Sequence, residues 1–244
     1  MSEKFSRGDG RSPHQLRPIT FQPGFTRWAE GSVLTQFGDT HVLCNVTIEN
    51  SLPPWLRGRE EPHGWLTAEY AMLPRSTHSR TRREQRWPKG RTQEISRLIG
   101  RSLRMALDLS LLGERTLTVD CDVLQADGGT RTAAVTGGWL AVVLALRPLI
   151  EAGELPSEVL ARQIAAISVG LVEGLPLLDL AYEEDVRAEV DFNVVMAGDN
   201  QLVEVQGTAE KAPFARTQLE ELIDLAAAGI TQLHTLQNAT IGKS

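Results

Sequence analysis

The alternation of hydrophobic and polar positions predicts two groups of strands. Residues 32–48 alternate around a turn at Phe37–Thr40, which is typical of a β-hairpin. Residues 117–123 alternate in the same way, so we expect a strand that is buried on one face. Four more strands are predicted at 164–172, 177–182, 188–196 and 202–206. A turn at Gly198–Asn200 favours an antiparallel sheet in this second group.

Hydrophobic residues at helical spacing predict three helices. Ile95, Leu98, Ile99, Ser102, Leu103 and Ala106 fall at i, i+3, i+4, i+7, i+8 and i+11, which is one face of an amphipathic helix. Residues 130–146 are small and apolar on nearly every face, so this helix should be buried. Apolar residues within 219–226 indicate a last helix, which we expect to end near Gly229.

The predicted order of elements is ββ-α-β-α-ββββ-α, with the strands gathered in groups between helices. This order favours an α+β fold over a doubly wound parallel sheet. The chain has no linker and no low-complexity tract, so we expect one compact domain over residues 1–244. Residues 75–90 lack apolar periodicity and are predicted to form a mobile basic loop.

The composition is that of a soluble globular protein, with 41% hydrophobic and 23% charged residues. No run of about 18 uncharged apolar residues is long enough to cross a membrane. Met1 to Gly10 is polar and lacks the apolar segment of a secretory signal. Cys44 and Cys121 stand singly in strand-like runs, which favours buried thiols over a disulfide or a metal site. We therefore expect a cytoplasmic protein.

Charge is distributed unevenly along the chain. The net charge is −6, yet residues 75–104 hold ten Lys or Arg and only two acids. A concentrated basic segment on an acidic body is typical of a local site for a polyanion. A solvated face held by salt bridges would give the same composition, and composition alone leaves both readings open.

Gly129, Thr130 and Arg131 form the first candidate site, between a predicted strand and a predicted helix. Glycine lets the backbone approach a ligand, and the free N–H groups of a helix start bind anions. Thr130 adds a hydroxyl, and Arg131 adds a forked cation that suits phosphate. The alternative is a simple turn before a helix.

Arg91 is the second candidate, at the start of the helix that contains Ile95. A cation at a helix N-terminus opposes the helix dipole, so a bound anion would explain its presence. The alternative is an exposed arginine that pairs with Glu94.

Acidic residues near 190 form the third candidate. Glu189 and Asp191 share one face of a predicted strand with Asn193, and Asp185 lies just before that strand. Clustered carboxylates suit a hard cation such as Mg²⁺. The alternative is the solvent-facing side of an antiparallel sheet.

The fourth candidate is the basic loop, whose spaced arginines could follow a phosphate backbone. The loop lacks alternating aromatic residues, so we do not expect it to be a base-stacking platform. We assign no catalytic role to His78, because the sequence offers it no partner.

Taken together, these motifs resemble those of the ribonuclease PH family over nearly the whole chain. The block Asp120–Ala133 is highly specific. The matching stretches are Arg7–Arg11, Leu16–Pro18, Ala29–Leu34, Phe37–Thr40, Gly64–Tyr70, Met72–His78, Gly90–Thr92, Glu94–Arg101, Asp120–Ala133, Asp191–Met196 and Glu204–Glu210. Two stretches depart from the family pattern, at 57–63 and 87–89. Both lie in predicted loops, so we expect them to change RNA affinity more than the chemistry of the reaction.

The resemblance implies a ribosomal protein S5 domain 2-like fold and a homo-hexameric ring built as a trimer of dimers. It implies a phosphorolytic 3′→5′ exoribonuclease that trims tRNA precursors and other RNA 3′ ends, with inorganic phosphate as co-substrate. Nucleoside diphosphates would leave, and reverse nucleotide addition would occur. We expect no membrane and no DNA partner.

The resemblance also implies roles for individual residues. The phosphate-binding positions are Arg91, Gly129, Thr130 and Arg131. The catalytic positions, which would also hold Mg²⁺, are Asp185 and Asp191. The tRNA-binding positions are Arg75, Arg80 and Arg83.

Two other functions are considered. A non-catalytic RNA-binding ring subunit of an exosome-like assembly would have no need of Arg91, Arg131, Asp185 and Asp191 together. A metal-dependent hydrolytic nuclease would need more converging acids and no arginine-built phosphate pocket.

Overall fold

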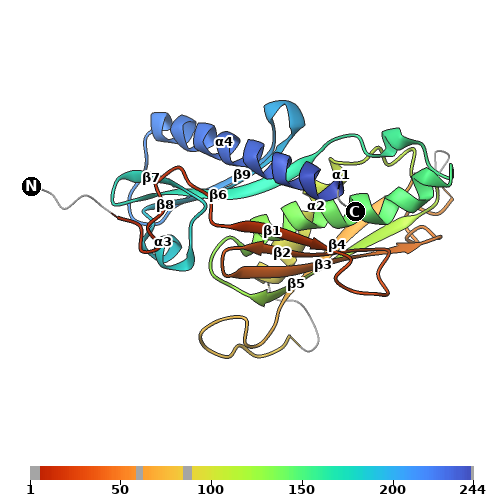
Figure 1. The fold of residues 1–244 in the computed structure, drawn as a ribbon, viewed down its shortest axis with the longest axis horizontal. Coiled ribbons are helices and arrows are strands. Elements are labelled where there is room, and N and C mark those ends of the chain that lie inside the picture. Colours follow the sequence, from red (N-terminus) through yellow and green to blue (C-terminus); the bar gives the residue numbers. More distant parts are fainter. Residues whose placement is uncertain (1–5, 59–62, 85–89, 243–244) are drawn as a thin grey trace, which may run out of the picture.

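The computed structural model describes residues 6–58, 63–84 and 90–242, which form two sheets and four α-helices (Figure 1). Residues 59–62 of the departure at 57–63 and all of the departure at 87–89 lie outside these ranges, as do Arg86 and Lys89 of the basic loop. The strands are β1 (Ile19–Pro23), β2 (Gly31–Phe37), β3 (Thr40–Glu49), β4 (Trp65–Met72), β5 (Thr116–Gln125), β6 (Ile164–Val172), β7 (Leu175–Leu178), β8 (Val190–Ala197) and β9 (Gln201–Ala209). The helices are α1 (Gly90–Arg104), α2 (Thr130–Glu151), α3 (Tyr182–Arg187) and α4 (Arg216–Ile241).

The first sheet has the strand order β1-β2-β3-β5-β4. β2 and β3 pair as an antiparallel hairpin with Phe37 opposite Thr40, which confirms the predicted turn. β4 and β5 run parallel, with α1 as the crossover between them. Because this crossover joins the two parallel strands directly, the start of α1 lies near the carboxyl end of β4.

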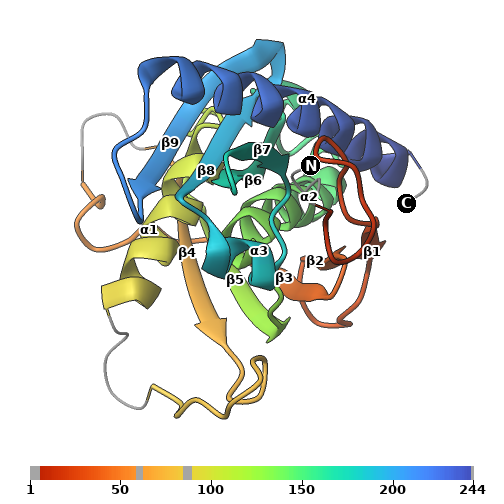
Figure 2. The same cartoon turned by 90° about the vertical axis from the view of Figure 1, so that its left-hand side faces the viewer.

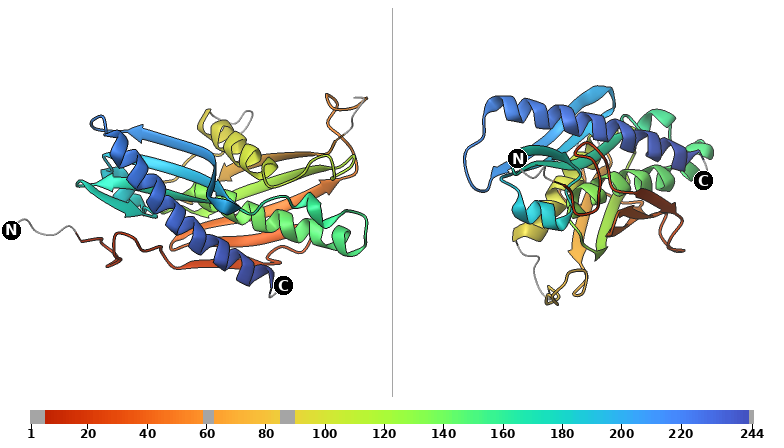
Figure 3. Two further views of the ribbon diagram at one scale, coloured as in Figure 1. Left: turned by 90° about the horizontal axis from the view of Figure 1, so that it is seen from above. Right: turned by 60° about the vertical axis from the view of Figure 1, so that its left-hand side comes forward.

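The second sheet has the order β7-β6-β8-β9, and all its pairs are antiparallel, as predicted for the C-terminal half. α4 lies across this sheet and contacts mainly β6 and β7 (Figures 1 and 3). Grouped strands with helices between them confirm the α+β class.

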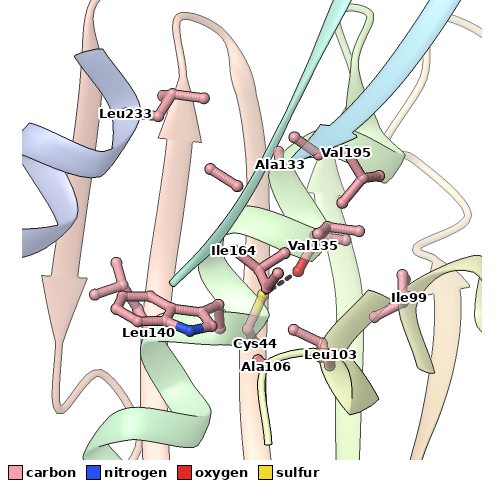
Figure 4. Packing of buried hydrophobic residues seen from close by; sticks show 14 of the residues in the cluster. Cys44, Ile99, Leu103, Ala106, Ala133, Val135, Leu140, Ile164, Val195 and Leu233 are labelled. Atoms are coloured by element: carbon pink, nitrogen blue, oxygen red, sulfur yellow. Dashed lines mark hydrogen bonds between the residues drawn. The ribbon is translucent and has the colours of Figure 1, made fainter. Parts of the chain in front are cut away.

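α2 lies at the centre of the core and contacts β2 and β3 of the first sheet, β6 of the second, and α1. It is long and apolar enough to cross a membrane by length and composition, but 72% of its most apolar stretch is buried inside this fold. Buried residues of both sheets and of α1, α2 and α4 form one continuous cluster. Figure 4 shows part of it around Cys44, Leu103, Val135, Ile164 and Leu233.

The two cysteines are buried and free, as predicted. Cys44 and Cys121 are paired across β3 and β5, with 3.9 Å between their Sγ atoms. Both side chains pack under α2, where the Cys44 thiol also lies 3.8 Å from the carbonyl oxygen of Ala134.

Two predicted boundaries were wrong. α4 does not end near Gly229 but continues to Ile241. Gly229 is buried in its middle, and a Cβ there would lie 2.7 Å from the side chain of Leu178. This glycine therefore brings α4 close to β7 and does not end the helix.

The predicted strand at 177–182 ends at Leu178, because Asp179 adopts a left-handed conformation with φ 57°. Tyr182 then begins α3, which was not predicted. β1 and β4 were also missed. The missed elements α3 and β4 both contribute side chains to the site described next.

Candidate active site

One pocket of about 680 Å³ collects every residue predicted for phosphate binding and catalysis. These lining residues are Arg91, Gly129, Thr130, Arg131, Asp185 and Asp191. They come from α1, from the turn before α2, from α3 and from β8, so the pocket joins segments far apart in sequence. Figure 2 faces the side of the molecule on which α1 and α3 lie.

The turn before α2 is built from two left-handed glycines, Gly128 with φ 76° and Gly129 with φ 66°. A Cβ on Gly128 would lie 2.6 Å from the carbonyl oxygen of Leu180 and 2.9 Å from the amide nitrogen of Tyr182. Only glycine therefore lets this turn pack against the start of α3. Gly129 caps α2 with no side-chain hydrogen bond. The N–H groups of the first turn of α2 thus remain suited to an anion in the pocket.

The hydroxyl of Thr130 is held by Tyr70, a buried residue at the end of β4. Their oxygen atoms are 2.8 Å apart. Burial raises the pKa of Tyr70, so its hydroxyl stays protonated. Tyr70 was not predicted as a site residue, although it closes the Gly64–Tyr70 stretch that matches the family.

Two arginines supply positive charge. Nη1 of Arg131 donates to Oε1 of Glu94 at 3.2 Å and to Oε1 of Gln206 at 2.9 Å. Glu94, considered above as a partner for Arg91, therefore pairs with Arg131. Arg91 is exposed, and no ion pair among residues 6–58, 63–84 and 90–242 includes it.

The two aspartates face these arginines. The pKa of Asp191 is raised to about 6, first by burial and then by the neighbouring carboxylate of Asp185. Burial also raises the pKa of Asp185, and Arg91 and Arg131 counteract part of that effect. The predicted juxtaposition of Asp185 and Asp191 is therefore present, with Asn193 also lining the pocket. Glu189 does not line it.

The carboxylates fit a hard divalent cation with few protein ligands. The described residues contain no group of three or more His, Cys, Asp or Glu placed to hold a metal. Mg²⁺, however, commonly binds through one or two carboxylates and completes its coordination with water and substrate phosphate. Asp185 and Asp191 repel each other in a partly buried pocket, and a cation between them would relieve that repulsion.

A buried ion network, not predicted from the sequence, supports α3. Arg7 binds both carboxylate oxygens of Glu184 at 2.7 Å, and both side chains are at most 4% exposed. The same guanidinium donates to the carbonyl oxygens of Leu178 and Asp179 at 2.9 Å. Since Glu184 immediately precedes Asp185, this network fixes the segment that carries a predicted catalytic residue.

A second buried pair links that segment to the glycine turn. Arg17 binds Asp179 through its side chain at 2.7 and 3.0 Å and through its backbone amide at 2.8 Å. It also donates to the carbonyl oxygen of Asp127, whose carboxylate accepts the amide of Tyr182 at 3.3 Å. Arg7 and Arg17 could have been identified from the sequence only because they lie in the family-matching stretches Arg7–Arg11 and Leu16–Pro18.

The arginines predicted to bind RNA lie outside the pocket. Arg75, Arg80 and Arg83 are exposed on the irregular segment that follows β4. The amide of Ala126 donates to the carbonyl oxygen of Ser76 at 2.8 Å, so the loop lies beside the end of β5. Burial raises the pKa of Asp122 in β5, and Arg83 partly offsets that effect. The described part of this loop has no regular structure, as predicted, and its mobility stays a prediction.

Family models of the 3′ exoribonuclease family match most of the chain. The model of domain 1 matches residues 15–148, and the model of domain 2 matches residues 162–229. The pocket takes Arg91, Thr130 and Arg131 from the first range and Asp185 and Asp191 from the second.

Full-length relatives named ribonuclease PH are similar to this chain. The protein from Cyanothece sp. is 57% identical over 239 residues, covering 98% of this chain and 99% of the relative. The protein from Corynebacterium efficiens is 54% identical over 240 residues, covering 98% and 97%.

Solved structures with the same fold are more distant in sequence. Rice (Oryza sativa) Rrp46 gives a TM-score of 0.78 at 20% identity and covers 97% of this chain and 100% of its own. The Archaeoglobus fulgidus exosome with RNA bound to the active site gives 0.75 at 22% identity, covering 94% and 92%. These structures confirm the predicted S5 domain 2-like fold.

The much higher identity to ribonuclease PH than to exosome subunits disfavours the alternative of a non-catalytic ring subunit. It confirms the predicted enzyme class, a phosphate-dependent 3′ exoribonuclease. The chain belongs to the ribonuclease PH family of 3′ exoribonucleases.

Proposed function

We propose that this protein trims the 3′ ends of tRNA precursors by phosphorolysis in the pocket between α1, α2, α3 and β8. One observation carries the proposal: Arg91, Thr130, Arg131 and the α2 N-terminus line the same pocket as Asp185 and Asp191. An anion site and a carboxylate pair in one pocket suit a reaction between inorganic phosphate and a phosphodiester.

The first task of such a site is to bring two anions together. Two unit negative charges about 4 Å apart repel by about 4 kcal/mol at an effective dielectric of 20. Arg91, Arg131 and the first N–H groups of α2 offset this repulsion and orient the phosphate. The hydroxyl of Thr130, positioned by Tyr70, adds a further contact.

In the reaction, an oxygen of inorganic phosphate attacks the phosphorus of the last phosphodiester. The bond from that phosphorus to the 3′ oxygen of the preceding nucleotide breaks, and that oxygen takes up a proton. A nucleoside 5′-diphosphate leaves, and the RNA is shorter by one nucleotide. The phosphodiester bond is exchanged for the phosphoanhydride bond of the diphosphate, so the reaction is nearly balanced in free energy and we expect it to run in reverse as nucleotide addition.

Asp185 and Asp191 would hold Mg²⁺. When bound, the ion neutralises charge on the scissile phosphate and the leaving oxygen. The chain itself contributes the two carboxylates and excludes bulk water from their buried sides.

The body of the RNA would contact Arg75, Arg80 and Arg83, which are exposed beside the pocket-lining segment Thr77–Ser79. A homo-hexameric ring, built as a trimer of dimers, would bring such loops from several subunits toward one bound tRNA precursor. Archaeal exosome structures share this fold, and one has RNA bound to its active site, which supports an assembly that binds RNA.

The test is an assay of the products from an end-labelled tRNA precursor with Mg²⁺, with and without inorganic phosphate. We expect nucleoside diphosphates only when phosphate is present. Nucleoside monophosphates in phosphate-free buffer would instead show hydrolysis, and no shortening in either buffer would show a subunit without activity.

A further inference from the structure

Two aromatic rings from different elements meet at the pocket. Tyr182, the first residue of α3, and His78, in the segment after β4, both line the pocket. Their ring centroids are 6.0 Å apart, and the ring planes are inclined by 49°. The sequence of the basic loop contains no stacking partner for His78, and the fold supplies one from a segment about a hundred residues away.

Tyr182 is fixed in place yet its ring is open to the pocket. Its amide donates to Asp127, and the glycine turn packs against its backbone. The residue is nevertheless 47% exposed. No hydrogen bond among the described residues involves its hydroxyl. An open aromatic face on an anchored backbone is arranged for contact with a ligand.

The geometry of α3 places this ring beside the reacting groups. Tyr182, Asp185 and Val186 are spaced i, i+3 and i+4, so they share one face of the helix, and all three line the pocket. Such neighbours have Cβ atoms roughly 5–6 Å apart. The ring of Tyr182 is therefore within one nucleotide's length of a carboxylate that serves the scissile bond.

We propose that Tyr182, backed by His78, is the nucleobase-stacking surface of this site and holds the base of one of the two nucleotides that flank the scissile bond. This inference rests on the proposed exoribonuclease function. The rest of the pocket offers charged groups, Arg91, Arg131 and the aspartates, which suit phosphates and a cation and leave the base to be held by another surface.

Stacking also suits an enzyme that removes nucleotides one after another. Every base presents a π-face, so an aromatic ring holds any base with similar strength. Base-edge hydrogen bonds would instead favour one base and stall the enzyme at the others. A pocket of about 680 Å³ has room for a nucleotide beside a phosphate.

The experiment is a double-mutant cycle between protein and RNA, measured as binding in phosphate-free buffer so that turnover does not interfere. The protein is wild type, Tyr182→Phe, Tyr182→Leu or Tyr182→Ala. The probe is a short single-stranded RNA labelled at its 5′ end. It is either intact or abasic at the last or at the next-to-last nucleotide.

For intact RNA we expect Tyr182→Phe to bind like wild type, because the aromatic face remains. Tyr182→Leu and Tyr182→Ala should weaken binding by about ten-fold, within the range for loss of one base–aromatic stack. On RNA that lacks the stacked base, at one of the two positions, all four proteins should bind alike. If the variants differ from wild type on intact RNA but not on this abasic RNA, Tyr182 contacts the missing base directly. A purely structural defect would weaken binding of both RNAs.

The proposal is overturned if the penalty of Tyr182→Ala is the same on intact RNA and on both abasic RNAs. Trp28→Ala is the matched control, since Trp28 is 84% exposed and does not line the pocket. Binding of intact RNA by this control should equal that of wild type. A wild-type protein that releases no diphosphates would refute the proposed function, whereas the binding cycle tests the stacking surface alone.

Discussion

At the scale of single residues, the pocket contains arginines that we propose bind phosphate and carboxylates that are costly to ionise. Arg91 is exposed in the first turn of α1, and Arg131 is held by Glu94 and Gln206. Asp191 is the group whose pKa is most clearly displaced toward neutrality. Each of these features leads to a measurable effect of one substitution.

Replacing Arg91 with Ala should raise the phosphate concentration needed for half-maximal activity while RNA binding stays close to normal. The loss of one charge-assisted contact costs roughly 1.5–3 kcal/mol, or about 10- to 150-fold in phosphate affinity. Arg97→Ala is the control, because Arg97 is exposed on the same helix but does not line the pocket. Superimposable phosphate titrations for Arg91→Ala and wild type would remove Arg91 from the phosphate site.

Asp191→Asn should nearly abolish turnover, yet without divalent cations it should melt at a higher temperature than wild type above pH 6. The folded-state pKa of Asp191, about 6, lies above its ordinary value of 3.8, so the fold favours the protonated carboxyl. The protonated carboxyl therefore stabilises the folded state fully below about pH 4, and this stabilisation is lost as the pH rises through 6. The ionised form thus costs about 2–3 kcal/mol above that pH, and Asn removes this cost.

The measurement is the melting temperature from pH 4 to pH 8 in a chelating buffer, followed by addition of Mg²⁺. The two proteins should converge near pH 4, and Mg²⁺ should stabilise wild type more than the variant. Equal melting temperatures for the two proteins at pH 8 would show that ionisation of Asp191 does not destabilise the folded state.

At the scale of elements, α3 is a helix of six residues that depends on partners outside itself. Isolated helices of this length are not stable in water. Arg7 and Glu184 hold it to the N-terminal segment, and Asp127 receives the amide of its first residue. The placement of Asp185 therefore depends on Arg7, Glu184 and Asp127, which do not line the pocket.

Glu184→Gln should destabilise the fold by about 3–5 kcal/mol, because it leaves the buried Arg7 without its carboxylate. Turnover should fall as well, since Asp185 follows directly. Glu183→Gln, on the exposed neighbour, is the control and should keep wild-type stability. Chemical denaturation of both variants decides the matter, and equal stabilities would contradict a supporting role for the Arg7 pair.

Sequence patterns predicted the long elements well because burial imposes a period. The alternation in β3 and β5 and the apolar face of α1 are clear examples. α3 is too short to show a period, and Gly229 was misread because a glycine used for close packing looks like one that ends a helix.

The candidate site was predicted as far as its charged residues, by resemblance more than by physics. Tyr70, Arg7 and Arg17 were missed because their roles depend on contacts across 60 to 177 positions of sequence. The tertiary fold brings these partners together, so the local pattern of hydrophobic and polar residues does not predict them.

At the scale of the whole molecule, the basic loop extends the reach of the pocket. Arg75, Arg80 and Arg83 are exposed, while Thr77–Ser79 between them line the pocket. The loop thus connects the reacting centre with a surface that can bind the body of a structured RNA.

Replacing these three arginines with Ala should reduce the salt dependence of binding to a tRNA precursor by roughly two units of slope, at about 0.7–0.9 per phosphate contact. Trimming of a short unstructured oligonucleotide should suffer much less, because it engages mainly the pocket. The two substrates are compared across a salt series. Equal losses on both, with an unchanged slope, would assign the loop to folding or assembly.

The pocket is shared between the two family domains, and this has a consequence for how the protein is made. The proposed phosphate-binding residues belong to the part that matches domain 1, and the two aspartates belong to the part that matches domain 2. Chains emerge from the ribosome with the N-terminal part first. A nascent chain thus carries half of a nuclease centre until Asp185 and Asp191 have been added and packed against α2. The pocket is therefore complete only after the second domain has been synthesised and folded onto the first.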